Sequence, residues 1–207
     1  MWGYLRLVPH ERVGPGGPAA GAGAPYADRR YADAELVDYT RPGFAVVYLE
    51  GEPPGAPPLE LAVRAGLAGL RLDPARGALA AGGEVRVVNR SGDPQVVTCP
   101  AAQVVRRLAP DEAFAFRVER AGGLELFVLG AQEGAARLFA APGPFALADA
   151  DGRYALLDVA PGPARLHAWH PRFPPADRPV ELVAGRVERA DLELGVGLAP
   201  SGGADAR

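Results

Sequence analysis

Lysine is absent from the sequence, so all 22 basic residues are arginine, a bias that we attribute to GC-rich coding rather than to function. Against 25 acidic residues they leave a net charge of −3, and no basic stripe with interleaved aromatic residues occurs, which disfavours nucleic-acid binding. Cysteine occurs once, at Cys99, which excludes an intrachain disulfide and leaves the redox compartment open. No apolar run reaches the length of a membrane span.

A leader segment is also missing from the start, because residues 1–5 continue directly into a predicted strand. Two explanations fit this start: a leader that has been removed, or a protein that stays inside the cell.

Sustained helical periodicity is missing as well, and alternation with period two takes its place. Between the alternating runs stand many of the 27 glycines and 22 prolines, as expected where short strands are joined by tight turns. Roughly a dozen strands at this spacing predict an all-β chain of one or two β-sandwiches. The predicted strands are 5–7, 44–49, 59–64, 84–88, 114–119, 124–129, 145–148, 153–157, 164–169, 180–183 and 187–194.

Three segments have the composition of connections. Residues 14–25 are almost entirely Gly, Pro and Ala and predict a mobile loop, and residues 199–207 predict a disordered tail. The stretch 52–58 carries four prolines and is a plausible crossing between domains.

The most specific motif in the sequence lies in its last third. Residues 148–156 form a D-x-D-G-x-Y-x-L hairpin, which is followed by the Pro161-Gly162 turn and by a strand at 166–170. This pattern resembles the carboxypeptidase-regulatory-like (transthyretin-like, carbohydrate-binding-like) β-sandwich. Residues 3–7 and 45–51 resemble the opening strands of that family. The resemblance implies a sandwich made of 1–51 plus 142–198 and interrupted by an insert at 52–141, although a sequential arrangement of the two sandwiches stays open.

The insert resembles a cupredoxin of the plastocyanin-like or methylamine-utilisation type. Residues 82–89 resemble the family's G-[TG]-x-V-x-x-x-N strand, and 123–127 resemble the strand that leads into the copper-ligand loop. Residues 108–116 resemble its L-x-P-G-x-x-x-x-F entry to a strand, with Asp111 at the glycine position. The resemblance implies a Greek-key sandwich.

The copper ligands that the family would supply are missing. No histidine follows in 90–98, where the first ligand is expected. The later ligand positions, for a thiolate, a second histidine and an axial methionine, hold Val128, Ala131 and Gly134. Blue copper needs two imidazoles and a thiolate in a trigonal arrangement, and these residues cannot provide them. We therefore expect no cofactor and no metal site.

Other metal or nucleophilic sites would have to come from His10, His167, His170, Cys99 and Met1. The two histidines of the predicted strand are three residues apart, so we expect them on opposite faces. Cys99 has no neighbouring imidazole in the sequence, and we expect it to be a small buried hydrophobic residue.

The acidic pair Asp149 and Asp151 has the spacing of calcium ligands or of an acid/base pair. An aspartate in a D-x-D-G turn normally accepts hydrogen bonds from its own backbone, and we expect that role here.

An aromatic platform for stacking on sugar rings is a further possibility. Trp169 alternates with His167 in the predicted strand, opposite Leu166 and Ala168, and we expect one of these two faces to be solvated. The residues of a possible ligand surface are Trp169, His167 and His170, and the platform would add Trp2, Tyr26, Tyr31 and Tyr39.

These observations favour a non-catalytic binding or scaffolding protein of the periplasm or the extracellular space. Its partner would be an unidentified protein or a cell-envelope polysaccharide. A carbohydrate-binding module and a metal-binding electron-transfer protein are the alternatives. An enzyme is not expected, because no Ser-His-Asp order, P-loop or Rossmann fingerprint is present.

Overall fold

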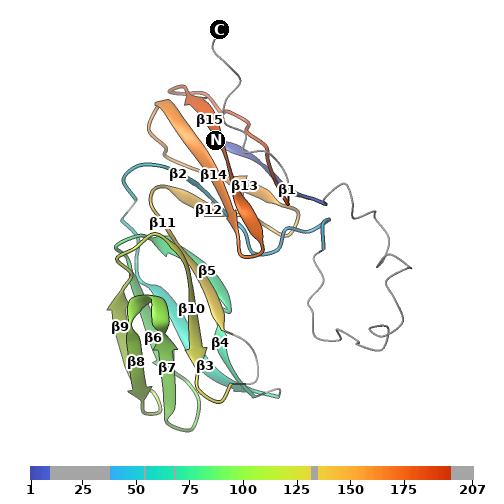
Figure 1. The fold of residues 1–207 in the computed structure, drawn as a ribbon. Coiled ribbons are helices and arrows are strands. Elements are labelled where there is room, and N and C mark those ends of the chain that lie inside the picture. Colours follow the sequence, from blue (N-terminus) through green and yellow to red (C-terminus); the bar gives the residue numbers. More distant parts are fainter. Residues whose placement is uncertain (10–37, 54, 68, 132–134, 197–207) are drawn as a thin grey trace, which may run out of the picture.

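A computed structural model of the chain describes residues 1–9, 38–53, 55–67, 69–131 and 135–196. The loop predicted at 14–25 and the tail predicted at 199–207 lie outside these residues. Sixteen strands and one short 3-10 helix, Pro100–Ala102, occur in the described ranges, which confirms the all-β class (Figure 1).

The strands form four sheets, which pack as two sandwiches. One sandwich, here the terminal sandwich, combines the sheets β13-β1-β16 and β12-β2-β14-β15. Its strands are β1 (Trp2–Val8), β2 (Val46–Leu49), β12 (Phe145–Leu147), β13 (Arg153–Ala155), β14 (Gly162–His170), β15 (Phe173–Leu182) and β16 (Leu192–Gly195). Strands from both ends of the described chain thus share sheets.

The other sandwich, here the central sandwich, combines the sheets β5-β11-β10-β7-β8 and β4-β3-β6-β9. Its strands are β3 (Leu59–Gly66), β4 (Gly69–Asp73), β5 (Arg76–Ala80), β6 (Glu84–Asn89), β7 (Gln95–Cys99), β8 (Val104–Leu108), β9 (Ala113–Arg117), β10 (Gly122–Val128) and β11 (Ala136–Ala141). In Figure 1 it lies below the terminal sandwich.

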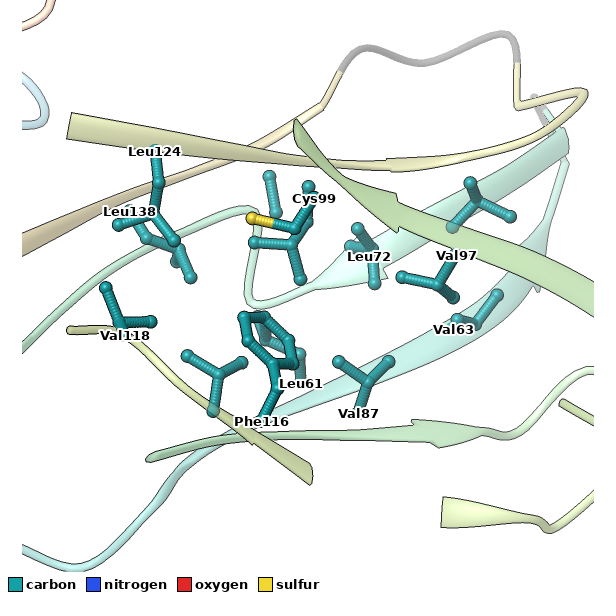
Figure 2. Packing of buried hydrophobic residues seen from close by; sticks show 14 of the residues in the cluster. Leu61, Val63, Leu72, Val87, Val97, Cys99, Phe116, Val118, Leu124 and Leu138 are labelled. Carbon is teal, nitrogen blue, oxygen red and sulfur yellow. The ribbon is translucent and has the colours of Figure 1, made fainter. Parts of the chain in front are cut away.

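The core of the central sandwich follows from the period of two along its strands. In β6 the side chains of Val85 and Val87 are buried, whereas Glu84 and Arg86 are exposed. Residues from both sheets meet in one apolar cluster, with Phe116 on one side and Leu138 on the other (Figure 2). Burying each large side chain of this kind stabilises the fold by about 1.5–3 kcal/mol.

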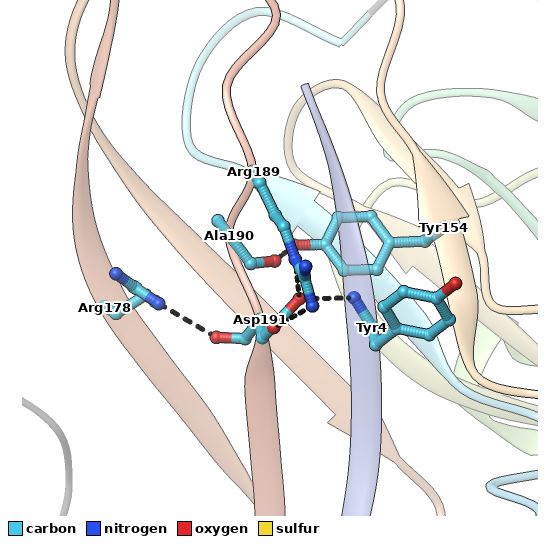
Figure 3. Close-up of polar contacts among 6 residues, drawn as sticks. All are labelled: Tyr4, Tyr154, Arg178, Arg189, Ala190 and Asp191. Atoms are coloured by element: carbon cyan, nitrogen blue, oxygen red, sulfur yellow. Dashed lines mark hydrogen bonds and ion pairs between the residues drawn. The ribbon is translucent and has the colours of Figure 1, made fainter.

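The terminal sandwich closes around Tyr154, which is buried in its core. The Tyr154 hydroxyl donates a hydrogen bond to the carbonyl oxygen of Ala190, just before β16 (Figure 3). A β-carbon at Gly3 would overlap that same carbonyl oxygen, so glycine is required for β1 to lie this close. The backbone N–H of Tyr4 donates to Asp191 at 3.0 Å, which fixes β1 beside β16.

Several strands differ from the prediction. The strands β4, β5, β7, β8 and β11 were not predicted, and β16 begins at Leu192 rather than at 187. The strand predicted at 180–183 begins much earlier, at Phe173, although Pro174, Pro175 and Pro179 lie within it. Proline is tolerated there because β15 is an edge strand, and because Pro174 and Pro175 lie at the irregularity in its pairing with β14.

A third apolar cluster joins the two sandwiches. Phe44 and Val46 of the terminal sandwich are buried together with Phe139 and Ala141 of β11. Trp169 packs against this cluster. The chain passes the junction next to Gly143, where a β-carbon would overlap the carbonyl oxygen of Leu49.

Candidate functional site

The loop that corresponds to the copper-ligand loop follows β10. Val128 ends that strand, pairs with Val97 of β7 and is only 6% exposed within the central core. The Ala131 N–H donates to the Val128 carbonyl oxygen at 3.1 Å, and Ala131 packs against the same core. Gly134 lies outside the described residues. The two described positions therefore offer apolar side chains that belong to the hydrophobic core.

The segment where the first copper ligand would stand is organised by Asn89. Its Nδ2 donates to the carbonyl oxygens of Asp93 and Leu108, at 2.9 Å and 3.1 Å. Its Oδ1 accepts from the Ser91 N–H at 3.0 Å and lies 2.7 Å from the Ser91 hydroxyl. Asn89 is fully buried, so each of these bonds replaces lost hydration. The turn after β6 is thus a self-contained hydrogen-bonded structure.

Sequence analysis did not predict most of the buried polar residues at this end of the central sandwich. Ser91 and Gln95 are buried beside Asn89, and Gln95 pairs in register with Leu108. The signal for them was the polar sequence of residues 89–93 between two apolar strands. That sequence is equally typical of an ordinary exposed turn.

Cys99 lies in the middle of the central core and has no exposed surface (Figure 2). Burial raises the pKa of its thiol above the ordinary value of 9.0. The expectation of a small buried hydrophobic residue is confirmed. In the described ranges, no group of three or more His, Cys, Asp and Glu side chains comes close enough together to hold a metal ion.

His167 lies on the face of β14 that is turned away from the terminal core and toward the junction. In the sheet it is paired with the neighbouring strand β2. Its ring stacks on Tyr48, with centroids 4.9 Å apart and 10° between the planes. Its Nε2 lies 2.9 Å from Oε1 of Glu50. The side chain is 16% exposed, so it is held between an aromatic ring and a carboxylate.

His170 is buried and has other neighbours. Its Nδ1 accepts a hydrogen bond from the Arg172 N–H at 3.1 Å, which leaves Nε2 to carry the proton and donate to the Pro42 carbonyl oxygen at 3.0 Å. Burial lowers the pKa of this imidazole below 6.5, and the nearby Arg172, Arg76 and Arg137 lower it further. His170 is therefore a neutral structural residue, and its hydrogen-bond partners among the described residues differ from that of His167.

Trp169 corrects the expectation that one face of β14 is solvated. Leu166 and Ala168 face the terminal core, as expected. The opposite face is covered too, because the Trp169 indole stacks on Phe139 at 4.6 Å and 30°, and lies edge-on to Phe44 at 5.7 Å. The central sandwich folds back against β14, which sequence alternation alone does not reveal. A cavity of about 480 Å³ borders the half-buried indole.

The other aromatic residues of the hypothetical sugar platform are dispersed. Trp2 and Tyr4 pack edge-on, 5.9 Å apart, on the outer side of β1, with Arg189 over both rings. Tyr39 packs on Phe173 at 6.1 Å. Tyr26 and Tyr31 lie outside the described residues. The structure does not bring Trp2, Tyr39 and Trp169 to one surface.

The acidic pair of the D-x-D-G turn binds its own backbone. Oδ1 of Asp149 accepts hydrogen bonds from the N–H groups of Asp151 and Arg153, at 3.0 Å and 2.8 Å. Gly152 follows with a φ of 79°, as the turn requires. The predicted structural role is confirmed for Asp149.

The solved structures to which this chain is similar are cupredoxins and related copper proteins. A purple cupredoxin from Nitrosopumilus maritimus matches 40% of this chain and 98% of its own length, with 12% identity and a TM-score of 0.34. The Cu(I) form of an amicyanin variant matches 45% and 97%, with 12% identity and a TM-score of 0.33. A copper-binding protein solved by NMR in its apo form matches 44% and 96%, with 17% identity and a TM-score of 0.32.

No protein-family model matches the chain, and no curated protein does. The likeness to solved structures is one of fold, over less than half of the chain, and copper is a property of those proteins. In the residues that the structure describes, no helix has the length and apolar character needed to cross a membrane.

Proposed function

We propose that this protein is a non-catalytic binding or scaffolding protein that acts outside the cytoplasm and carries a cupredoxin-like sandwich without copper. The observation that carries this proposal is the apolar character of the former ligand loop. Val128 and Ala131 occupy positions where the family's thiolate and imidazole would stand, and both pack into the central core.

The chemistry of type 1 copper explains why this observation is decisive. Cu(I) and Cu(II) are held there by two imidazoles and a thiolate, with a weak axial ligand. The chain's one thiol, Cys99, is enclosed in the core on β7, and both described histidines belong to the terminal sandwich. The described thiol and imidazoles therefore do not come together at the end of β10.

We propose further that the chain has two domains, 1–51 plus 142–198 and 52–141. Support comes from strand pairing across the gap: β1 pairs with β13 and β16, and β2 pairs with β12 and β14. The carboxypeptidase-regulatory-like identity of the first domain is a proposal that rests on the D-x-D-G hairpin and the turn at Gly162, whose φ is 128°. The dispersed aromatic residues give no support to a carbohydrate platform around Trp169.

Titration with Cu(II), followed by visible absorption and calorimetry, tests the proposal. We expect no intense thiolate-to-copper absorption band and no stoichiometric high-affinity binding. A blue or green complex that saturates at one copper per chain overturns the proposal. Fractionation of the native cells tests the location, and recovery of the intact protein in the cytoplasm would contradict an extracytoplasmic role.

A further inference from the structure

A second, smaller cavity lies where the two sandwiches meet, and cationic side chains surround it. It has a volume of about 150 Å³ and is lined by the segment before β2, the start of β5, the start of β11 and the turn between β14 and β15. The four cations that line it are Arg41, Arg76, Arg137 and Arg172.

Cationic side chains outnumber carboxylates among the described residues that line this cavity. Asp38 carries the one carboxylate there, and two of the four guanidinium groups, those of Arg76 and Arg137, already have interaction partners of their own. Oδ1 of Asp38 accepts hydrogen bonds from the N–H and the hydroxyl of Thr40, which, with Arg41, lower the pKa of that carboxyl. Nε of Arg137 donates a hydrogen bond to Oε1 of Glu125 at 3.3 Å. Like charges at this density repel one another, so an anion in the cavity would stabilise the arrangement.

The wall of the cavity is fixed by His170, which is neutral and buried. Through its two ring nitrogens it holds the Pro42 carbonyl on one side and the Arg172 N–H on the other. It thereby sets the backbone positions of the segments that carry Arg41 and Arg172. Gly43, with a φ of 65°, turns the chain at this point, and a β-carbon there would lie 3.8 Å from Nη1 of Arg76.

We propose that this cavity binds a tetrahedral oxyanion of the phosphate class. Guanidinium groups bind phosphate oxygens through paired, charge-assisted hydrogen bonds, and several of them around a small cavity suit a compact dianion. Arg41 and Arg172 are the principal binding residues. Neither exposed side chain lies within 4.0 Å of a carboxylate oxygen among the residues that the structure describes, although Arg41 is near enough to Asp38 to lower the pKa of that carboxyl.

The ligand would bridge the two sandwiches. Arg41 and Arg172 belong to the terminal sandwich, whereas Arg76 and Arg137 begin strands of the central sandwich. Bound phosphate would therefore stabilise the junction and the fold together, by an amount that grows with the logarithm of one plus the ratio of its concentration to its dissociation constant. This site is independent of the proposed function.

The test is titration of the full chain with inorganic phosphate, in a phosphate-free buffer at low ionic strength, followed by calorimetry and by thermal unfolding. We expect saturable binding of one phosphate and a rise in the melting temperature. Arg172→Gln and Arg41→Gln should each weaken binding about 10-fold or more, because each removes charge-assisted hydrogen bonds. Arg186→Gln removes an exposed arginine elsewhere in the terminal sandwich and should bind like the parent.

Three results overturn the proposal. The first is no saturable binding, and the second is equal weakening by Arg186→Gln and Arg172→Gln. The third is acetate binding as tight as phosphate binding, which would identify a carboxylate site instead. Because Arg41 and Arg172 are exposed, their variants should keep the circular dichroism spectrum of the parent and unfold in phosphate-free buffer at an equal or higher urea concentration, which separates lost binding from lost folding.

Discussion

The indole of Trp169 stacks on the ring of Phe139, with centroids 4.6 Å apart and 30° between the planes. This contact joins β14 of the terminal sandwich to β11 of the central sandwich. Offset aromatic pairs of this kind contribute about 0.5–1.5 kcal/mol beyond the burial of their area. The contact occupies one face of the indole, and a cavity of about 480 Å³ borders the half-buried ring.

Gly123 leaves room for that indole. A β-carbon at Gly123 would lie 2.8 Å from Cζ2 of Trp169, so Gly123→Ala must displace the ring and should lower the free energy of unfolding by about 1–3 kcal/mol. Urea denaturation measures the change. The matched control is Gly92→Ala, where no heavy atom lies within 4 Å of the added carbon. Equal stability of the two variants would show that the junction is not packed as described.

Asn89→Ala should destabilise the central sandwich by about 3 kcal/mol. The substitution leaves the buried carbonyl of Leu108 and the buried N–H of Ser91 without their partner, and each such loss costs about 1–3 kcal/mol. Arg90→Ala is the control, since it removes only an exposed ion pair with Asp111, worth about 1 kcal/mol or less. The chemical denaturation midpoints of both variants give the comparison, and a shift for Asn89→Ala as small as the control's would refute this role.

Protonation of His170 should make the fold less stable in acid. Its pKa is lower in the folded chain than its ordinary value of 6.5, so the unfolded chain binds the proton more readily. This contribution to stability is therefore complete well above pH 6.5 and is lost as the pH falls through 6.5 toward the folded-state pKa. Burial and the cations Arg172, Arg76 and Arg137 act in the same direction.

Urea midpoints measured between pH 5 and 8 test this dependence. The His170→Gln variant should show a flatter profile below pH 6.5 than the parent chain, whereas His167→Gln should retain the His170 contribution. Parallel profiles for the parent and His170→Gln would contradict the assignment.

A fragment of residues 52–141 should fold alone. Every buried residue of the central core lies between Leu61 and Ala140, so the fragment keeps that core intact. It exposes Phe139 at the former junction and should be less stable than the full chain. Dispersed amide resonances and one cooperative unfolding transition are expected. A fragment with collapsed resonances would argue against two domains.

The parts of the fold that follow from local chemistry could be predicted from the sequence. The Asp149 turn depends on its own backbone, and β6 depends on alternation within six residues. The length of β15 was underestimated because prolines are accepted mainly in edge strands. Whether a strand lies at an edge depends on the whole sheet. Likewise, no local sequence pattern predicts that Trp169 will stack on Phe139, thirty positions earlier in the chain.

The candidate sites divide in the same way. That Val128 and Ala131 cannot ligate copper was evident from the sequence, because an aliphatic side chain cannot ligate copper in any fold. The arginine cavity was not foreseen, since Arg41, Arg76, Arg137 and Arg172 come from four separate segments and converge only through the packing of two sandwiches.

An anaerobic titration of the ¹⁵N-labelled chain with Cu(I) tests most directly whether the chain lacks a copper site. It detects colourless binding as well. The amide resonances of Val128 and Ala131 should stay in place through one equivalent of copper. Saturable shifts of these two amides at one copper per chain would show that the loop after β10 is a metal site.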